Sequence, residues 1–430
     1  MTPKILSATS MENSLREGRF VFSIPQLAWK MAGWLAWVLP LLVISFIVIH
    51  NPARGSVTPV YHDEVDLWFH RQPLQLFYFP QFVLLFAPFH LLLSPLGDVA
   101  WRWMATAGLG FGLYYLLRNS FPNSNWRAFA LVSLASMPLM LGSIRNGQAN
   151  AQLAAALVLA AVCMLRQRWW WGTLFLMIAI ITKPLGLAAA GLAFVVFPQM
   201  RWRLPAGIFL LFALPFLFGP PSYVAGQLAS SVQKLKQCEV LSEWRCVCQA
   251  HSLPDQEAAL SAVAEGAALS PKSDISGLLI QLGIPFAGFP ATLTRIAAGL
   301  MVALVCWLIA ASRDKLQSVS IWFTASTMWL MLFNPMTETN SYVILAPLFG
   351  WWIWYFVENK KVRLACGLAI LCLSMPVLRN VIETFVGSQY ANAFADAFFP
   401  AVTIILTVVA SREFYVQFSN KVEIKLGIGI

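Results

Sequence analysis

Long apolar runs recur along almost the whole chain, separated by short polar segments. Their length and continuity predict membrane-spanning helices, because about 20 apolar residues are needed to cross a bilayer as a helix. Strands in a membrane barrel would instead alternate apolar and polar positions. We therefore expect an all-α, polytopic helical membrane protein with about 12–13 transmembrane helices. The runs lie at 32–50, 79–97, 101–117, 128–143, 150–165, 169–182, 184–199, 204–220, 294–311, 318–333, 341–357, 364–378 and 392–410, with a weaker candidate at 276–290.

Basic clusters between these runs predict the orientation of the chain. Short loops rich in Lys and Arg stay on the cytoplasmic side of a membrane. The net charge of +10 is therefore a topology signal and does not indicate nucleic-acid binding. The clusters lie at 166–171, 201–203, 312–315, 358–363 and in the C-terminal tail.

The same rule divides the chain into cytoplasmic, membrane and outer regions. The two long polar segments fall outside, so we expect the chemistry on the outer face. The regions are a cytoplasmic leader (1–31), an N-terminal transmembrane catalytic module (32–220) with outer loop 51–78, an outer loop region (221–293), C-terminal transmembrane helices (294–411) and a cytoplasmic tail (412–430).

The number of crossings between residues 79 and 143 is ambiguous. Counting from the leader and counting from the tail give results that differ by one crossing. Either one run in this stretch is re-entrant, or Arg118 and Arg127 break the positive-inside rule.

The first outer loop contains the segment VYHDEVDLWFHRQPL, residues 60–74. On a helix its apolar and polar residues separate, which predicts an amphipathic helix at the outer membrane surface. Glu64 lies with the apolar side. A carboxylate on the polar side could act as a general base, two of them could hold a divalent cation, or the face could simply be solvated. The apolar side holds Tyr61, Val65, Trp68 and Phe69, and the polar side His62, Asp63, Asp66 and His70.

A polar knot, GSIRNGQANAQ at 142–152, interrupts two apolar runs. Arg145 supplies a cation, and Gln148 and Asn150 supply amide donors and acceptors. Such groups at a membrane-embedded helix start usually line a cavity or contact a ligand. The alternative is a capped helix end, with Asn146 or Asn150 as the cap and Arg145 reaching the headgroups.

Lys183 stands between two apolar stretches and is followed by Pro184, which breaks the helix. A lysine at this depth needs a partner, and a lipid-linked phosphate suits a compact ammonium. The alternative is a lysine at a tight turn that reaches the outer headgroups.

A second outer turn lies within FNPMTETNSYVILAPL, residues 333–348. Thr337 or Thr339 could cap the following helix. Glu338 and Asn340 offer the planar acceptors and donors that sugar recognition uses. The alternative is a plain capped loop.

Three cysteines, Cys238, Cys246 and Cys248, lie in the outer region 221–293. On an oxidising face a disulfide from Cys238 to one of the other two is expected, leaving one thiol. A zinc site would need a fourth ligand, such as His251. The remaining four cysteines lie in apolar runs and behave as small hydrophobic residues.

The order of these motifs resembles glycosyltransferase family 87. The resemblance is carried by Y..E..LW…QPL…YFPQFVLLFAPFHLL in the first outer loop and the run after it, by RNGQAN opening a helix, and by TKP about thirty residues later. The enzymes of this family are integral-membrane transferases that use polyprenol-phosphate sugars. They include the mannosyltransferases that extend phosphatidylinositol mannosides in mycobacteria.

The resemblance implies a GT-C fold with an active site at the periplasmic face of a bacterial inner membrane. It implies an inverting, mannosyltransferase-like reaction that uses no cofactor or metal. The partners would be the polyprenyl-phosphate sugar, a lipid or glycan acceptor and membrane lipids, with no nucleic acid. In this reading Lys183 and Arg145 bind the donor phosphate. The base comes from Asp63, Asp66 or Glu64, and the substrate-binding residues are Tyr61, His62, Gln148, Asn150, Glu338 and Asn340.

The chain departs from the family pattern in two places. The family carries Asp three residues before the loop Tyr, where this chain has Thr58, and some members carry His in the later turn, where it has 337–340. Three other functions also stay open, and the missing Asp supports the last of them. They are a transporter or flippase of lipid-linked sugars, a ligase-type transferase that uses a diphosphate carrier, and an inactive scaffold that retains the fold.

Overall fold

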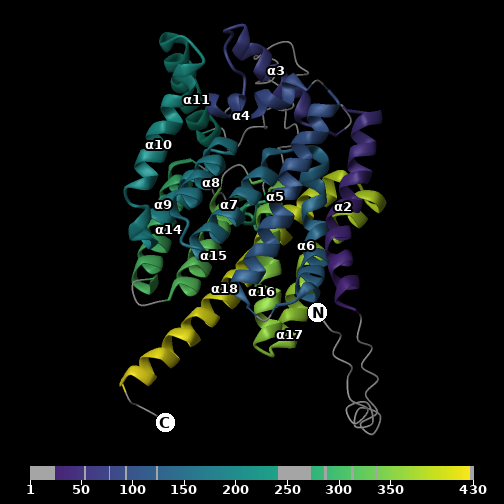
Figure 1. Cartoon of the computed structure of the whole chain (residues 1–430), viewed down its shortest axis with the longest axis vertical. Helices are drawn as coiled ribbons and strands as arrows, with labels where there is room; N and C mark the ends of the chain where they lie inside the picture. Colours follow the sequence, from purple (N-terminus) through teal and green to yellow (C-terminus); the bar gives the residue numbers. More distant parts are fainter. Residues whose placement is uncertain are drawn as a thin grey trace, which may run out of the picture.

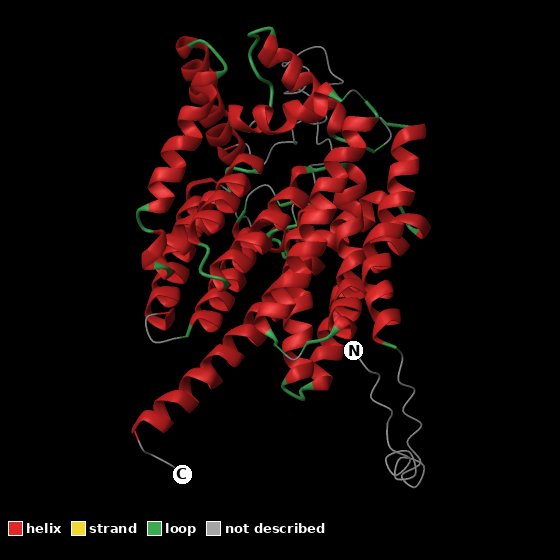
Figure 2. Cartoon of the chain, in the orientation of Figure 1, coloured by secondary structure: helices red, strands yellow, loops and turns green. Residues whose placement is uncertain are grey.

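The computed structural model describes residues 25–52, 55–76, 78–92, 94–122, 124–240, 273–284, 288–310, 314–334 and 337–426. All regular structure within these ranges is helical (Figure 2). Seven helical stretches among them are long and apolar enough to cross a membrane, and four shorter apolar helices accompany them. An all-α, polytopic membrane protein is thereby confirmed, while the count of about 12–13 spans stays a prediction.

The predicted first outer loop forms a layer across one end of the bundle (Figure 1). Helix α2 (Gln26–His50) runs up to this end, where α3 (Thr58–Phe69) and α4 (Pro80–Leu91) follow. Helix α5 (Leu96–Ser120) then runs down through the bundle, and α6 (Trp126–Asn146) runs back. We call the end that carries α3 and α4 the α3 end.

The prediction of one span over residues 79–97 is wrong. Helix α4 has 12 residues, about 18 Å of helix, which is too short for a hydrocarbon core of about 30 Å. It packs beside α3 and is followed by Pro95 and the start of α5. The run therefore enters and leaves at the same end, which removes the disagreement of one crossing.

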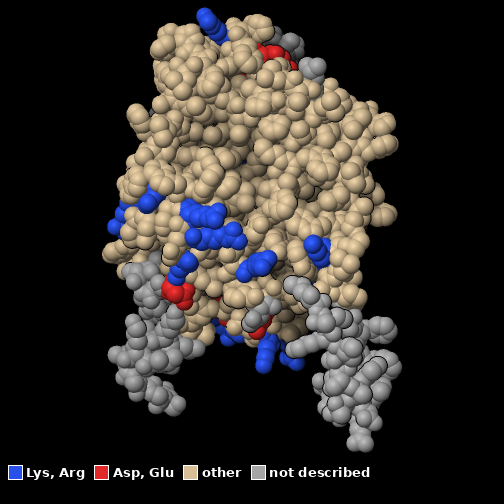
Figure 3. Space-filling model, in the orientation of Figure 1, with Lys and Arg blue, Asp and Glu red and all other residues tan. Residues whose placement is uncertain are grey.

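Basic residues gather at the end opposite α3. Lys30 lies over the ring of Trp126 at 5.4 Å, Arg127 lies over Trp29 at 5.8 Å, and Arg166 donates to Asn119 at 3.2 Å. On the face shown in Figure 3, most Lys and Arg lie in the lower half. Arg127 and the end of α5, with Arg118, thus lie with the other basic clusters and keep to the positive-inside rule.

The rest of the chain completes the bundle around α7, which is buried along nearly its whole length. Its Ala residues let the neighbouring helices α5 and α8 approach closely. The remaining elements are α7 (Ala149–Leu165), α8 (Trp169–Thr182), α9 (Gly186–Val196), η1 (Pro198–Met200), α10 (Arg203–Ala213), η2 (Leu214–Leu217), α11 (Pro221–Val240), α13 (Ile275–Gln281), α14 (Gly288–Ala310), α15 (Lys315–Phe333), η4 (Thr339–Ile344), α16 (Ala346–Glu358), α17 (Val362–Phe385) and α18 (Ser388–Leu426).

The re-entrant path of 79–97 can be tested by labelling cysteines from each side of the membrane. Gln72→Cys and Leu92→Cys should react with an impermeant maleimide from one side, and Arg127→Cys should react from the other. The wild-type protein measures background from native cysteines. If Leu92→Cys reacts from the side that labels Arg127→Cys, residues 79–97 cross the membrane and the re-entrant path is wrong.

Candidate active site

Helix α3 is the amphipathic helix that the sequence predicts. Tyr61, Val65 and Trp68 are buried, whereas Asp63 and Asp66 are exposed. The Tyr61 ring packs edge-on against Phe82 at 4.8 Å. Its hydroxyl accepts a hydrogen bond from the Ala149 N–H at 3.3 Å. Tyr61 therefore satisfies a backbone donor in the first turn of α7, besides any contact with a substrate.

Glu64 is buried and anchors the chain that follows α3. Its Oε1 accepts the N–H groups of Gln75 and Leu76, both at 2.7 Å. Burial raises the pKa of Glu64, and the two N–H groups offset part of that rise. Since one oxygen is committed to the backbone, Glu64 holds the shape of the loop. Asp63 and Asp66 are the acids of α3 that face water.

His62 connects α3 to both of the next two helices. Its Nε2 lies 3.2 Å from Oδ1 of Asp98 in α5, and its Nδ1 lies 3.0 Å from Nδ1 of His90 in α4. His90 Nε2 in turn lies 3.4 Å from Asp66 Oδ1. Burial alone would raise the pKa of Asp98, but hydrogen bonds from His62, Thr58 and Ser94 outweigh it, so the pKa is lowered.

The polar knot at 142–152 meets the second outer turn. Gln148 donates to Oε2 of Glu338 at 3.1 Å. Asn150 donates to Gln148 Oε1 at 2.9 Å and to Ser341 Oγ at 3.3 Å. Asn340 lies against Gly142, where an added Cβ would come within 2.7 Å of its Oδ1. Four of the predicted substrate-binding residues are thus brought together from segments 190 positions apart.

The caps of these two segments differ from the expected ones. Gln148 stands at the N-cap position of α7, in place of Asn146 or Asn150, after Gly147 has ended α6 in the left-handed region. Glu338 caps η4 together with Ser341, in place of Thr337 or Thr339. The sequence shows that polar side chains lie near the start of a helix. Which of them caps the helix depends on the backbone conformation just before the first turn.

Arg102 is a buried residue that the sequence reasoning missed. It is 1% exposed and donates to the Asp98 carbonyl at 2.8 Å and to Ser56 Oγ at 2.8 Å. It also donates to the carbonyl of Arg145, whose own side chain is exposed. The sequence signal for Arg102 was a charged residue inside the apolar run 101–117. Such a charge is costly in a membrane unless its N–H groups are hydrogen-bonded.

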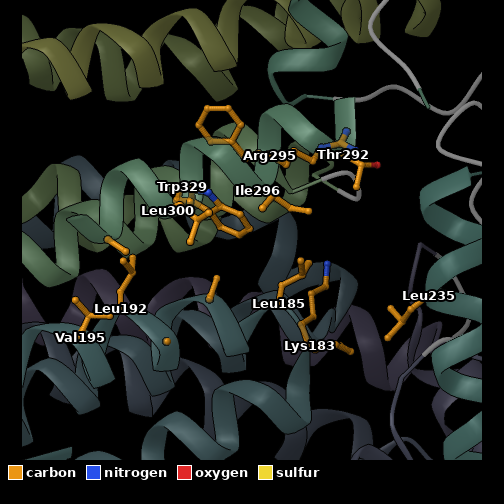
Figure 4. Close-up of a pocket in the computed structure, with 16 residues that line it drawn as sticks. Lys183, Leu185, Leu192, Val195, Leu235, Thr292, Arg295, Ile296, Leu300 and Trp329 are labelled. Carbon is orange, nitrogen blue, oxygen red and sulfur yellow. The ribbon is translucent and has the colours of Figure 1, made fainter. Parts of the chain in front are cut away.

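Lys183 lies at one end of a groove of about 740 Å³ between α9, α14 and α15. It is 6% exposed and follows α8 in an extended conformation, because Pro184 prevents the helix from continuing. Figure 4 shows Lys183 and Arg295 on opposite walls at the same end of the groove. The other end is apolar and includes Leu192, Val195 and Leu300.

Arg295 is the second cation of the groove and was also missed from the sequence. Its NH2 donates to Ser276 Oγ at 3.0 Å and lies 3.7 Å from Oδ2 of the buried Asp274. Its Nε has no hydrogen-bond partner among the residues that the structure describes. The sequence signal was its isolation, because no other basic residue lies between Lys272 and Arg313.

The metal and disulfide predictions have different outcomes. Over the described ranges, no three His, Cys, Asp or Glu residues are grouped so that they could hold a metal ion. Cys246, Cys248 and His251 lie outside the described residues, and the Cys238 side chain is not described either. The disulfide therefore stays a prediction.

The chain has sequence similarity to one family of transferases. The family model of Glycosyltransferase family 87 matches residues 76–245, a region that contains Gln148, Asn150 and Lys183. This match confirms the resemblance seen in the sequence, and with the helical fold it supports a membrane glycosyltransferase. No curated protein sequence matches the chain.

Among solved structures, the chain matches the apo form of the Archaeoglobus fulgidus oligosaccharyltransferase. The two are 12% identical, with a TM-score of 0.37, over 84% of this chain and 56% of the archaeal one. The chain thus spans little more than half the length of that protein.

The structural role of Glu64 predicts a contrast between two substitutions. Glu64→Gln keeps an oxygen acceptor for both N–H groups and should unfold at a similar temperature. Glu64→Ala should cost about 1–3 kcal/mol, because it leaves buried N–H groups without a partner. Thermal unfolding in detergent measures both.

The pH dependence of unfolding provides a second readout. Because the pKa of Glu64 is raised in the folded state, its contribution to stability is lost as pH rises through that pKa. Glu64→Gln should therefore gain stability relative to wild type as pH rises. Equal losses in the Gln and Ala variants would contradict the assignment.

Proposed function

We propose that this protein transfers a sugar from a polyprenyl monophosphate donor to a lipid or glycan acceptor at the α3 end of the bundle. The observation that carries the proposal is the groove with two cations at one end and apolar walls beyond them. A polyprenyl phosphate has the same division, with one charged group at the end of a hydrocarbon chain.

The groove suits the donor's phosphate at Lys183 and Arg295. Phosphate oxygens accept hydrogen bonds from an ammonium and from a guanidinium, and such charge-assisted bonds are strong where water is excluded. Arg295 is oriented by Ser276 and Asp274, and its Nε hydrogen has no acceptor in the described part of the chain. The two cations would also stabilise the charge that the phosphate gains as the sugar leaves. Arg145 does not line the groove, so its predicted contact with the phosphate stays a prediction.

Helix α14 gives the donor's tail a route from the bilayer. Only 11% of the most apolar stretch of this helix, within Ala291–Ile309, is buried against the rest of the protein, so most of the helix faces lipid. One wall of the groove is formed by α14, from Thr292 to Ala303. A lipid tail could therefore enter sideways while its headgroup stays at the membrane surface.

The polar end of the bundle would hold the sugar and the acceptor. Gln148, Asn150 and Glu338 form a bonded set of amide and carboxylate groups, which suits sugar hydroxyls. The exposed Asp66 or Asp63 would take the acceptor's proton, in a single displacement that inverts the anomeric carbon. A mannosyl donor and a bacterial inner membrane with the α3 end outward complete the proposal, and the basic residues at the opposite end support that orientation.

Removing either groove cation should slow transfer strongly. Lys183→Met and Arg295→Gln should each lower the rate of transfer by about 10²–10³-fold, the cost of losing one group that stabilises a developing anion. The assay supplies polyprenyl-phosphate mannose and other polyprenyl-phosphate sugars to the purified protein in proteoliposomes, with thermal unfolding measured in parallel.

Arg201→Gln is the matched control. Arg201 is an exposed cation after α9 that does not line the groove, and its loss should leave transfer unchanged. Full activity in both groove variants would overturn the phosphate assignment. Movement of the labelled donor across the vesicle membrane without any acceptor would instead indicate a flippase.

A further inference from the structure

Four titratable side chains form a continuous line across the α3 end. The line runs from Asp66 through His90 and His62 to Asp98, with contacts of 3.4, 3.0 and 3.2 Å. It joins three helices, since Asp66 and His62 belong to α3, His90 to α4 and Asp98 to α5. The Asp66 side chain is 56% exposed, whereas that of Asp98 is 1% exposed. The line therefore leads from water to a buried carboxylate.

Counting hydrogens along this line shows one vacant proton position. An ionised carboxylate only accepts hydrogen bonds, so His62 Nε2 donates to the buried Asp98. The hydrogen of His90 lies either on Nε2, toward Asp66, or on Nδ1, toward His62, and the other of these two contacts is then left without a hydrogen. Two neutral imidazoles carry two hydrogens, but the three contacts use three. Adding one proton to the histidine pair completes the line and gives it a charge-assisted bond.

The surroundings hold this line in place without filling the vacant position. Ser94 donates to Asp98 Oδ2 at 2.9 Å, and Arg102 donates to the Asp98 carbonyl at 2.8 Å. Phe86 packs edge-on against His62 at 5.1 Å. The other ionisable groups on these elements are Tyr61, Asp63 and Glu64 on α3, and Tyr114, Tyr115 and Arg118 toward the far end of α5. His70, which follows α3, bonds the backbone carbonyl of Asp66. None of these groups supplies the missing hydrogen in the described structure.

We propose that Asp66, His90, His62 and Asp98 form a relay that accepts the proton released by the acceptor hydroxyl during sugar transfer. This inference rests on the proposed function and adds to it three positioning residues behind the exposed acid. Asp66 contacts the acceptor, whereas His90, His62 and Asp98 act through it.

The reaction balances with this relay as the proton acceptor. The acceptor's oxygen forms a bond to the anomeric carbon, and the bond from that carbon to the donor's phosphate oxygen breaks. The leaving phosphate keeps the electron pair of the broken bond. The O–H bond of the acceptor also breaks, and its proton passes to Asp66. When the His90 hydrogen lies on Nδ1, the bare Nε2 of His90 takes up this proton from Asp66, and all three contacts then hold a hydrogen. Exposure of Asp66 lets the relay return the proton to water before the next turnover.

The proton count can be measured without any substrate. Nitrogen NMR of ¹⁵N-histidine-labelled full-length protein, assigned with single His→Gln variants, reports which ring nitrogens carry hydrogen at each pH. His62 and His90 should take up one proton between them in a single coupled step, because binding it creates one shared bond. Asp98→Asn should change that step. Independent titration of the two rings would overturn the relay.

The catalytic part of the inference is tested by the pH profile of transfer. Activity should fall as pH decreases, because the vacant position is then already filled. In His90→Gln, the rate at neutral pH should fall about 10²-fold, and the acid limb should move to lower pH because Asp66 is then the sole acceptor. KM for the donor should stay the same. His50→Gln is the matched control, because the His50 ring bonds the Phe46 carbonyl of its own helix.

The outcomes separate this inference from the proposed function. If His90→Gln lowers the rate without moving the acid limb, the histidines are merely structural and the relay is overturned, while the transferase proposal stands. If wild-type protein transfers no sugar but the two rings still titrate as one unit, the proton-binding line stands and its catalytic role is overturned.

Discussion

The amphiphilic donor that we propose would impose the constraint on which the rest of this structure depends. A phosphate on a hydrocarbon chain cannot enter an apolar core, and its tail cannot leave the bilayer for water. A protein that binds such a molecule needs a lipid-facing groove that ends in cations at the membrane surface. The groove between α9, α14 and α15 has this form, with Lys183 and Arg295 at one end.

Buried polar groups at the α3 end bond one another and tie its segments together. Arg102 joins Ser56, Asp98 and the Arg145 carbonyl, so that the first outer loop, α5 and the end of α6 form one unit. Glu64 fixes the chain after α3 in the same way. Buried polar groups with complete hydrogen bonding hold positions closely, which a transfer reaction requires. The groove is bounded by the loosely packed α14, and this would let the proposed lipid-linked donor enter from the bilayer.

Sequence reasoning predicted the features that depend on local pattern. Continuous apolar runs predicted the helical membrane fold. The amphipathic spacing of residues 60–70 predicted α3, and Pro184 predicted the helix break beside Lys183. Pairings over long separations could not be read in the same way. The contact of Gln148 with Glu338 spans 190 positions, and the meeting of Arg295 with Lys183 depends on how α14 packs. The predicted span over residues 79–97 was wrong because hydropathy shows that a segment is apolar but not whether its two ends lie on the same side of the membrane.

Mapping the tail of a bound donor most directly tests the central claim. A photoreactive polyprenyl monophosphate would be added to the wild-type protein in vesicles, irradiated, and located by mass spectrometry of the peptides. The account predicts adducts on the lining of the groove, in residues 188–195 and 296–303, reduced by competition with unlabelled polyprenyl monophosphate. Adducts confined to other helices, or adducts at the groove that the competitor does not reduce, would contradict it.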